Sequence, residues 1–186
     1  MTRLLTLLFV ASLSSCLSPD QITLTQEREM LELESLLKRQ VVSVPTLSIE
    51  KKVTLDGVSD VQQLPYEAEL IGKDLEAVLD LSFADLVQLS NYDKILSEQT
   101  INVSYIRKPG ENYGPLSIAL EMEITEEVLG AEIVLAEDNF LYQSHKNIKL
   151  SFDGSRLSQY TISGGQKLIG MDSSSYTIHA IIKAKS

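Results

Sequence analysis

The amino-acid sequence predicts an α+β protein, in which N-terminal helices pack on an antiparallel β-meander of about six or seven strands. Two changes of pattern along the chain lead to this prediction. In the first half, apolar residues recur at three- and four-residue steps, as they do along one face of a helix. From Ile95 onward the apolar period becomes two, which is typical of strands with one buried face. A curved or closed β-barrel is the alternative architecture.

Two early segments are predicted to be helical. The first covers residues 23–41, where glutamates crowd the early half and Lys38 and Arg39 stand in the last turn, an order that complements the helix dipole. Its apolar stripe consists of Met30, Leu33, Leu37 and Val41. The second segment covers residues 66–90 and is most regular from Asp74 onward. We expect the first helix to pack on its own domain; a stalk or a partner-binding helix is the alternative.

The predicted strands are short and are separated by turn-forming residues. One strand at residues 48–55 ends at the pair Asp56-Gly57, and the most regular alternation covers residues 116–124. The pair Gly164-Gly165 is interpreted as another tight turn. Short turns between such strands indicate an antiparallel meander that is solvated on one face. Further strands are expected at residues 101–105, 131–136, 140–143, 147–152, 157–162, 167–169 and 176–183.

The first fifteen residues have the features of a secretion signal. Arg3 supplies their only charge, and the apolar run that follows is shorter than the roughly 20 residues that span a bilayer. The segment ends in Leu13-Ser14-Ser15-Cys16, which resembles the lipobox of bacterial lipoproteins. The resemblance implies attachment of diacylglycerol to Cys16, cleavage before it, and acylation of the new amino terminus by a fatty acid such as palmitate. An ordinary signal peptide with an incidental cysteine is the alternative.

On this interpretation the chain has three parts. Residues 1–15 form the lipoprotein signal peptide, residues 16–22 a lipidated tether, and residues 23–186 a single α+β domain. Two or more acyl chains hold a protein stably on a membrane, whereas one chain binds only marginally. Leu17 follows the cysteine, in place of the aspartate that is associated with inner-membrane retention. The family rule therefore favours the outer membrane.

Three later segments resemble parts of small uncharacterised lipoproteins of Bacteroidota-type bacteria. They lie at residues 139–144, 160–167 and 176–178, and an extra glycine in the second departs from the pattern of that group. The resemblance adds to the expectation of an outer-membrane location. It implies no activity and no functional residues.

Charge and cysteine content exclude several classes of function. The formal net charge is −10, which makes the chain a poor candidate for binding nucleic acid. Cys16 is the only cysteine, so lipidation would leave no thiol for a disulfide, for catalysis or for a metal in the mature domain. The partners expected are therefore the membrane, through the lipid on Cys16, and another protein of the envelope.

No set of residues predicts catalysis, a cofactor or a metal ion. The chain lacks a G-x-S-x-G nucleophile motif, and its two histidines, His145 and His179, are interpreted as surface residues. Glu121 and Glu123 share one strand face and are interpreted as solvated. The only modified site predicted is Cys16.

These observations predict a non-enzymatic lipoprotein of the cell envelope that binds or scaffolds another component. The alternative is a carrier or sensor that holds an apolar ligand between a curved sheet and its helices. An enzyme with an unfamiliar site is a third possibility, which clustered carboxylates with perturbed pKa values in a cleft would support.

Overall fold

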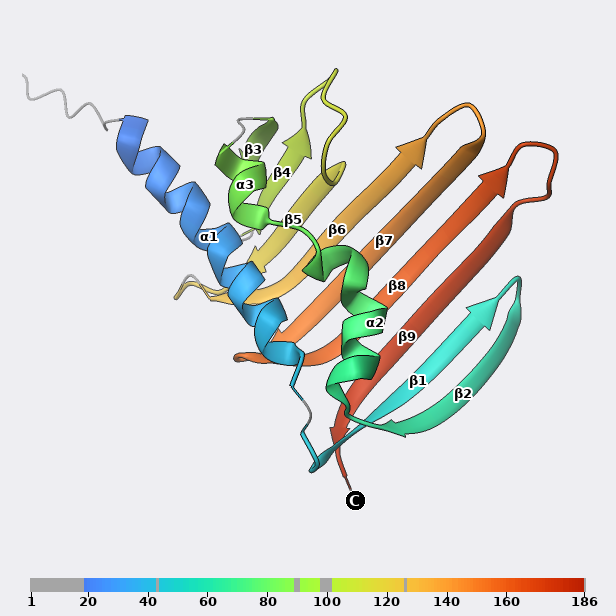
Figure 1. The fold of residues 1–186 in the computed structure, drawn as a ribbon. Coiled ribbons are helices and arrows are strands. Elements are labelled where there is room, and N and C mark those ends of the chain that lie inside the picture. The colour runs from blue at the N-terminus through green and yellow to red at the C-terminus, as the bar shows by residue number, and fades with distance from the viewer. Residues whose placement is uncertain (1–18, 43, 89–90, 98–101, 126, 186) are drawn as a thin grey trace, which may run out of the picture.

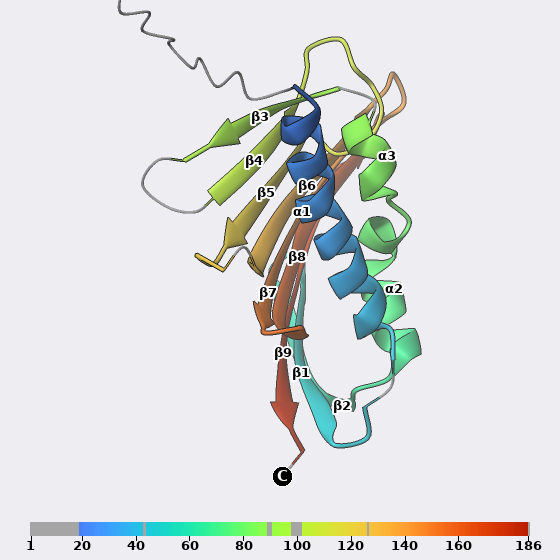
Figure 2. The same ribbon diagram turned by 90° about the vertical axis from the view of Figure 1, so that its left-hand side faces the viewer.

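The protein is built on one large antiparallel sheet with helices on one of its faces (Figures 1 and 2). The computed structural model describes residues 19–42, 44–88, 91–97, 102–125 and 127–185. The helices are α1 (Pro19–Gln40), α2 (Ala68–Leu79) and α3 (Phe83–Gln88). The strands are β1 (Leu47–Leu55), β2 (Val58–Pro65), β3 (Tyr92–Leu96), β4 (Asn102–Arg107), β5 (Ser117–Met122), β6 (Val128–Asp138), β7 (Tyr142–Asp153), β8 (Arg156–Leu168) and β9 (Ser174–Ala184).

The predicted fold class is wrong, and so is its barrel alternative. The described chain is mostly strand, in one sheet of nine strands with the order β2-β1-β9-β8-β7-β6-β5-β4-β3. The sheet is not closed, because β2 and β3 lie at opposite edges. Strand β2 gives no apolar alternation, since its side chains are exposed apart from half-buried Leu64. Pairing with β1 through the Asp56-Gly57 turn forms this strand, and both turn residues have the positive φ that such a turn requires.

The glycine pair was also wrongly predicted. Gly164 and Gly165 do not turn the chain but lie inside β8, which continues to Leu168. A side chain on Gly164 would meet the ring of Tyr176, and a side chain on Gly165 would meet the ring of His145. Each glycine therefore leaves room for a ring from a neighbouring strand.

Helix boundaries differ from the prediction in two places. Helix α1 begins at Pro19, inside the predicted tether, because proline suits the first turn of a helix. The region predicted as one helix over residues 66–90 is divided into α2 and α3, with Asp80 capping the end of α2. The predicted signal peptide, Cys16 and Leu17 lie outside the described residues.

The core lies between the helices and the face of the sheet that they cover. Helix α1 contributes its predicted stripe, of which Met30, Leu33 and Leu37 are buried. The central strands contribute residues that alternate with polar ones, such as Ile118 on β5 and Ile148 on β7. These side chains belong to one continuous hydrophobic cluster. Apolar burial across this layer is therefore the main force that holds the helices on the sheet.

Helix α2 is attached to the sheet by a partly buried carboxylate. Lys51 on β1 donates a hydrogen bond to one oxygen of Asp74 at 2.7 Å, and the hydroxyl of Tyr160 on β8 donates to the other at 2.5 Å. The side chains of the Lys51–Asp74 ion pair are 13% and 9% exposed. Because a buried charge is costly unless it is paired and hydrogen-bonded, this arrangement sets where α2 lies on the sheet.

Helix α1 is attached in the same way on the other half of the sheet. Glu29 forms an ion pair with Lys94 of β3 at 3.0 Å and accepts a hydrogen bond from the hydroxyl of Tyr105 of β4 at 2.6 Å. Each long helix thus carries one carboxylate that is held by a lysine and a tyrosine from two strands. Burial, followed by the hydrogen bond to the carboxylate, raises the pKa of both Tyr105 and Tyr160 well above the usual value near 10.

The C-terminal end of α1 is fixed by Gln40, which is 4% exposed. Its amide nitrogen donates to the backbone oxygen of Ser155 at 3.0 Å, and its amide oxygen accepts from the backbone N–H of Leu157 at 2.9 Å. The hydroxyl of Tyr66 donates to the backbone oxygen of Gln40 at 3.0 Å. The first two bonds join the end of the helix to the turn between β7 and β8 and the start of β8, and the third joins it to the segment between β2 and α2.

Tyr160→Phe should change how stability depends on pH. Because the pKa of Tyr160 is raised in the folded protein, the neutral phenol stabilises the fold fully below about pH 10, and this contribution is lost as the pH rises through the folded pKa. The variant should be about 1 kcal/mol less stable than the wild type at pH 7, and the difference should shrink above about pH 10. Urea unfolding at a series of pH values measures it.

Tyr113→Phe is the matched control, because Tyr113 is 62% exposed. It should leave the pH dependence of the wild type unchanged. A difference between the wild type and Tyr160→Phe that stayed constant above pH 10 would contradict the raised pKa.

Candidate functional site

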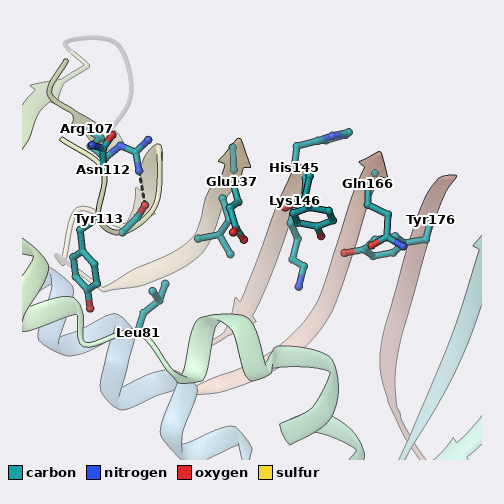
Figure 3. Close-up of a pocket in the computed structure, with 15 residues that line it drawn as sticks. Leu81, Arg107, Asn112, Tyr113, Glu137, His145, Lys146, Gln166 and Tyr176 are labelled. Atoms are coloured by element: carbon teal, nitrogen blue, oxygen red, sulfur yellow. Dashed lines mark hydrogen bonds between the residues drawn. The ribbon is translucent and has the colours of Figure 1, made fainter. Parts of the chain in front are cut away.

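The most distinctive concave feature is a pocket on the helix-covered side of the sheet, where β6, β7, β8 and β9 extend beyond the helices (Figure 3). Its volume is about 560 Å³, and we call it the sheet pocket. Its lining residues are Leu81, Arg107, Asn112, Tyr113, Gly114, Leu135, Ala136, Glu137, Tyr142, Ser144, His145, Lys146, Gly165, Gln166 and Tyr176.

The floor of the sheet pocket is made by alternate residues of the sheet. Lys146 on β7 stands opposite Leu135 on β6 and Gly164 on β8, and Gly164 in turn stands opposite Tyr176 on β9. Because side chains alternate along a strand, Lys146 projects from the same face as Ile148, which belongs to the core. The floor is thus the continuation of the core face, with polar side chains where the helices no longer cover it.

A wall of the sheet pocket is formed by the loop between β4 and β5. Arg107 donates a hydrogen bond to the backbone oxygen of Gly114 at 2.8 Å, and the Tyr92 hydroxyl donates to that of Pro115 at 2.9 Å. Gly114 has a φ of +82°, and a Cβ there would lie 2.6 Å from a methyl group of Leu86. Burial raises the pKa of Tyr92 to about 12. Only glycine suits this position, because a side chain would be strained and would meet Leu86. The close contact with Leu86 fixes the position of this wall.

The opposite wall depends on Gly164. The hydroxyl oxygen of Tyr176 lies 2.8 Å from where a Cβ on Gly164 would be, so the ring lies against the strand. Burial, followed by the nearby Tyr142, raises the pKa of Tyr176. Packing of a ring on a strand glycine replaces the side chain that the glycine lacks. The glycine therefore determines how far the aromatic wall reaches over the floor.

Lys146 is the charged group most available to a ligand. Its side chain is half-buried, and Figure 3 shows it extending from β7 toward the helices, between Tyr113 on one side and Tyr176 on the other. No ion pair or hydrogen bond joins its ammonium to another residue in the described ranges. Arg107 adds a second positive charge, and Glu137 supplies a carboxylate at the exposed end. The lining is therefore net positive in a protein with a net charge of −10.

The residues considered in the sequence do not assemble into a catalytic centre. His145 is exposed at the rim of the sheet pocket, and His179 is half-buried with its Nδ1 3.0 Å from the hydroxyl of Thr161. Glu121 and Glu123 are exposed, as expected from the sequence. Among the residues that the structure describes, no group of three or more His, Cys, Asp and Glu side chains is arranged to hold a metal ion.

The sequence did not identify the sheet pocket. The sequence predicts two short strands, 140–143 and 147–152, with residues 144–146 between them, whereas β7 continues from Tyr142 to Asp153. One signal was present: Tyr142, Ser144 and Lys146 have the parity of Ile148, so a face that is apolar further along becomes polar. The depth of the pocket comes from the loop before β5 and from Leu81, which only the fold brings to this place.

Comparison with known proteins gives no match. No protein-family model matches the chain, and neither a curated protein nor a solved structure does so. The resemblance to bacterial lipoproteins therefore stays a prediction from the sequence. In the described part of the chain, no helix is both long enough and apolar enough to cross a membrane.

Proposed function

We propose that the protein is a lipid-anchored, non-enzymatic binding protein of the bacterial cell envelope. Its ligand site is the sheet pocket, and the ligand is a small molecule with an apolar or aromatic part and an anionic group. The half-buried Lys146 is the observation that carries this proposal, because a cation without a partner in the described residues suits an anion. The apolar part would lie against Leu81, Leu135 and the aromatic walls.

The shape and size of the pocket support a small molecule. Ligand sites in proteins have volumes of roughly 300–1,000 Å³ and combine apolar walls with a few polar groups. The sheet pocket, at about 560 Å³, lies within this range. The alternative of an apolar ligand held between sheet and helices has less support, since buried side chains such as Leu33, Leu75 and Ile133 fill that space.

Binding is favoured over catalysis by the orientation of the polar side chains. Ser144 and His145 are neighbours on β7, so they project to opposite faces and do not form a nucleophile–base pair. In the described residues around the pocket, the only carboxylate in the lining is Glu137, which is exposed. A general acid–base pair would need two groups with different environments.

The lipid anchor is proposed from the sequence. Cys16 precedes the first residue of α1, Pro19, by three positions, which an extended chain spans in at most about 11 Å. A lipid on Cys16 would therefore hold the beginning of α1 close to the membrane surface. Leu17 at the next position favours the outer membrane.

Cys16→Ala should abolish membrane attachment. The wild type, expressed in a bacterial host, should partition into the detergent phase of a phase-separation assay and carry the mass of its acyl chains. The variant should lack that mass and lose the partitioning, because no thiol is left to accept diacylglycerol. Ser15→Ala keeps a small residue before the cysteine and should behave as the wild type. The anchor fails if wild type and Cys16→Ala fractionate identically as soluble proteins.

Lys146→Met should weaken the binding of an aromatic anion. The probe is 8-anilinonaphthalene-1-sulfonate, which combines apolar rings with one sulfonate and is followed by its fluorescence. Loss of the charge-assisted contact should raise the dissociation constant by about tenfold.

Lys167→Met is the matched control, since Lys167 is exposed and has the opposite parity on the neighbouring strand. It should bind the probe as the wild type does. Equal affinity in Lys146→Met and the wild type would contradict the ligand site.

A further inference from the structure

Large apolar side chains are exposed at the tips of two neighbouring hairpins. Phe140 and Leu141 lie in the turn between β6 and β7, and Leu168, Ile169 and Met171 lie at the turn between β8 and β9. Phe140 is 86% exposed and Met171 63%. We call these five residues the tip cluster. Single exposed apolar residues are ordinary, whereas a group of this size at one place marks a contact surface.

The backbone holds the tip cluster in a defined arrangement. The Ile169 N–H donates to the backbone oxygen of Leu141 at 3.0 Å, which joins the two turns. The side-chain oxygen of Asn139 accepts hydrogen bonds from the N–H groups of Leu141 and Tyr142, each at 3.0 Å. The Met171 N–H donates to the backbone oxygen of Leu168 at 3.1 Å. Because these bonds already order the two turns, little further conformational entropy is lost when the exposed apolar side chains bind a surface.

The tip cluster and the beginning of α1 both lie far from the C-terminal end of β9, on opposite sides of the view in Figure 1. Figure 1 shows both turns at the upper right and the first turn of α1 at the upper left, with β3, β4 and β5 between them, and the C-terminal end of β9 at the bottom. A bilayer that lies across the top of Figure 1 would meet both the tip cluster and a lipid on Cys16, which would lie within about 11 Å of Pro19.

We infer that the tip cluster inserts into the surface of the bilayer that holds the Cys16 lipid and forms a second, apolar membrane contact. The inference rests on the proposed lipid anchor for the orientation of the molecule. A bilayer suits the cluster better than a protein partner does, because five side chains on two turns offer less area than the roughly 800 Å² per partner of a stable interface. The same side chains can enter the interfacial layer of a membrane while the strands behind them stay in water.

The charges around the tip cluster select the kind of lipid surface. The charged residues within three positions of the tip cluster along the chain are Glu137, Asp138, Lys167 and Asp172, and the whole chain has a net charge of −10. Attraction to anionic headgroups is therefore not the source of binding. Insertion should occur in zwitterionic phosphatidylcholine vesicles and should be insensitive to salt.

The experiment uses the lipidated protein, purified from the host and reconstituted into phosphatidylcholine vesicles. The chain contains no tryptophan, so Phe140→Trp introduces a single indole into the tip cluster. Ile124→Trp is the matched control, because Ile124 is 85% exposed in the turn between β5 and β6, at the other end of those strands. Ile169→Trp is the second variant, which is used if Phe140→Trp does not fold by circular dichroism.

The indole of Phe140→Trp should emit at shorter wavelength and be quenched by lipids brominated near the headgroup, at least about threefold more than that of Ile124→Trp. The inference would be overturned if, in the anchored protein, acrylamide dissolved in the water quenched the indoles of both variants equally. Protection that rises with the ratio of protein to lipid would also overturn it and would assign the cluster to a second copy of the chain. A protein that fails to reconstitute at all contradicts the anchor instead, so the two failures are distinguishable.

Discussion

The position of the helices on the sheet depends on how two carboxylates are buried. Asp74 lies between an apolar helix face and the sheet, where its charge is compensated by Lys51 and by the hydroxyl of Tyr160. Glu29 is held in the same way by a lysine of β3 and a tyrosine of β4. Apolar packing holds the helices on the sheet but does not select one position for them. A helix in a different position would leave its buried carboxylate without partners, which would cost several kcal/mol. The two groups of contacts therefore determine the position of each long helix.

This constraint explains where the proposed ligand site and the proposed membrane contact lie. The helices cover the middle of the sheet, and the longest strands, β6 to β9, continue beyond them at one end. On the face that carries the helices, this extension forms the floor of the sheet pocket. Lys146 lies there on the same face of β7 as the core residue Ile148. At the ends of the same strands, the turns carry the exposed tip cluster, with Phe140 at its most exposed point. The proposed ligand site and the proposed membrane contact thus lie at the same end of strands β6 to β9.

The sequence predicted elements whose own residues determine them and missed those that depend on neighbours. The α1 stripe and the strand around Ile118 followed from local periodicity and were confirmed. Strand β2 could not be predicted because hydrogen bonds to β1, and not burial, form it. The sequence alone predicts a turn at Gly164, because the ring of Tyr176, which occupies its side-chain space, comes from another strand. The sequence missed the pocket for the same reason. A lysine in a polar segment suggests an exposed residue, and only the fold shows that Lys146 projects from the face of the sheet that carries the helices.

The most direct test of this account is the effect of Asp74→Ala on the free energy of unfolding, measured by urea denaturation beside Glu69→Ala. Both residues belong to α2 and pair with lysine, but the side chain of Glu69 is 80% exposed and that of Asp74 is 9% exposed. Asp74→Ala should cost about 3 kcal/mol, because it leaves the ammonium of Lys51 and a tyrosine hydroxyl without their partner, whereas Glu69→Ala should leave the free energy of unfolding nearly unchanged. Equal losses in the two variants would contradict the central role of the buried carboxylate.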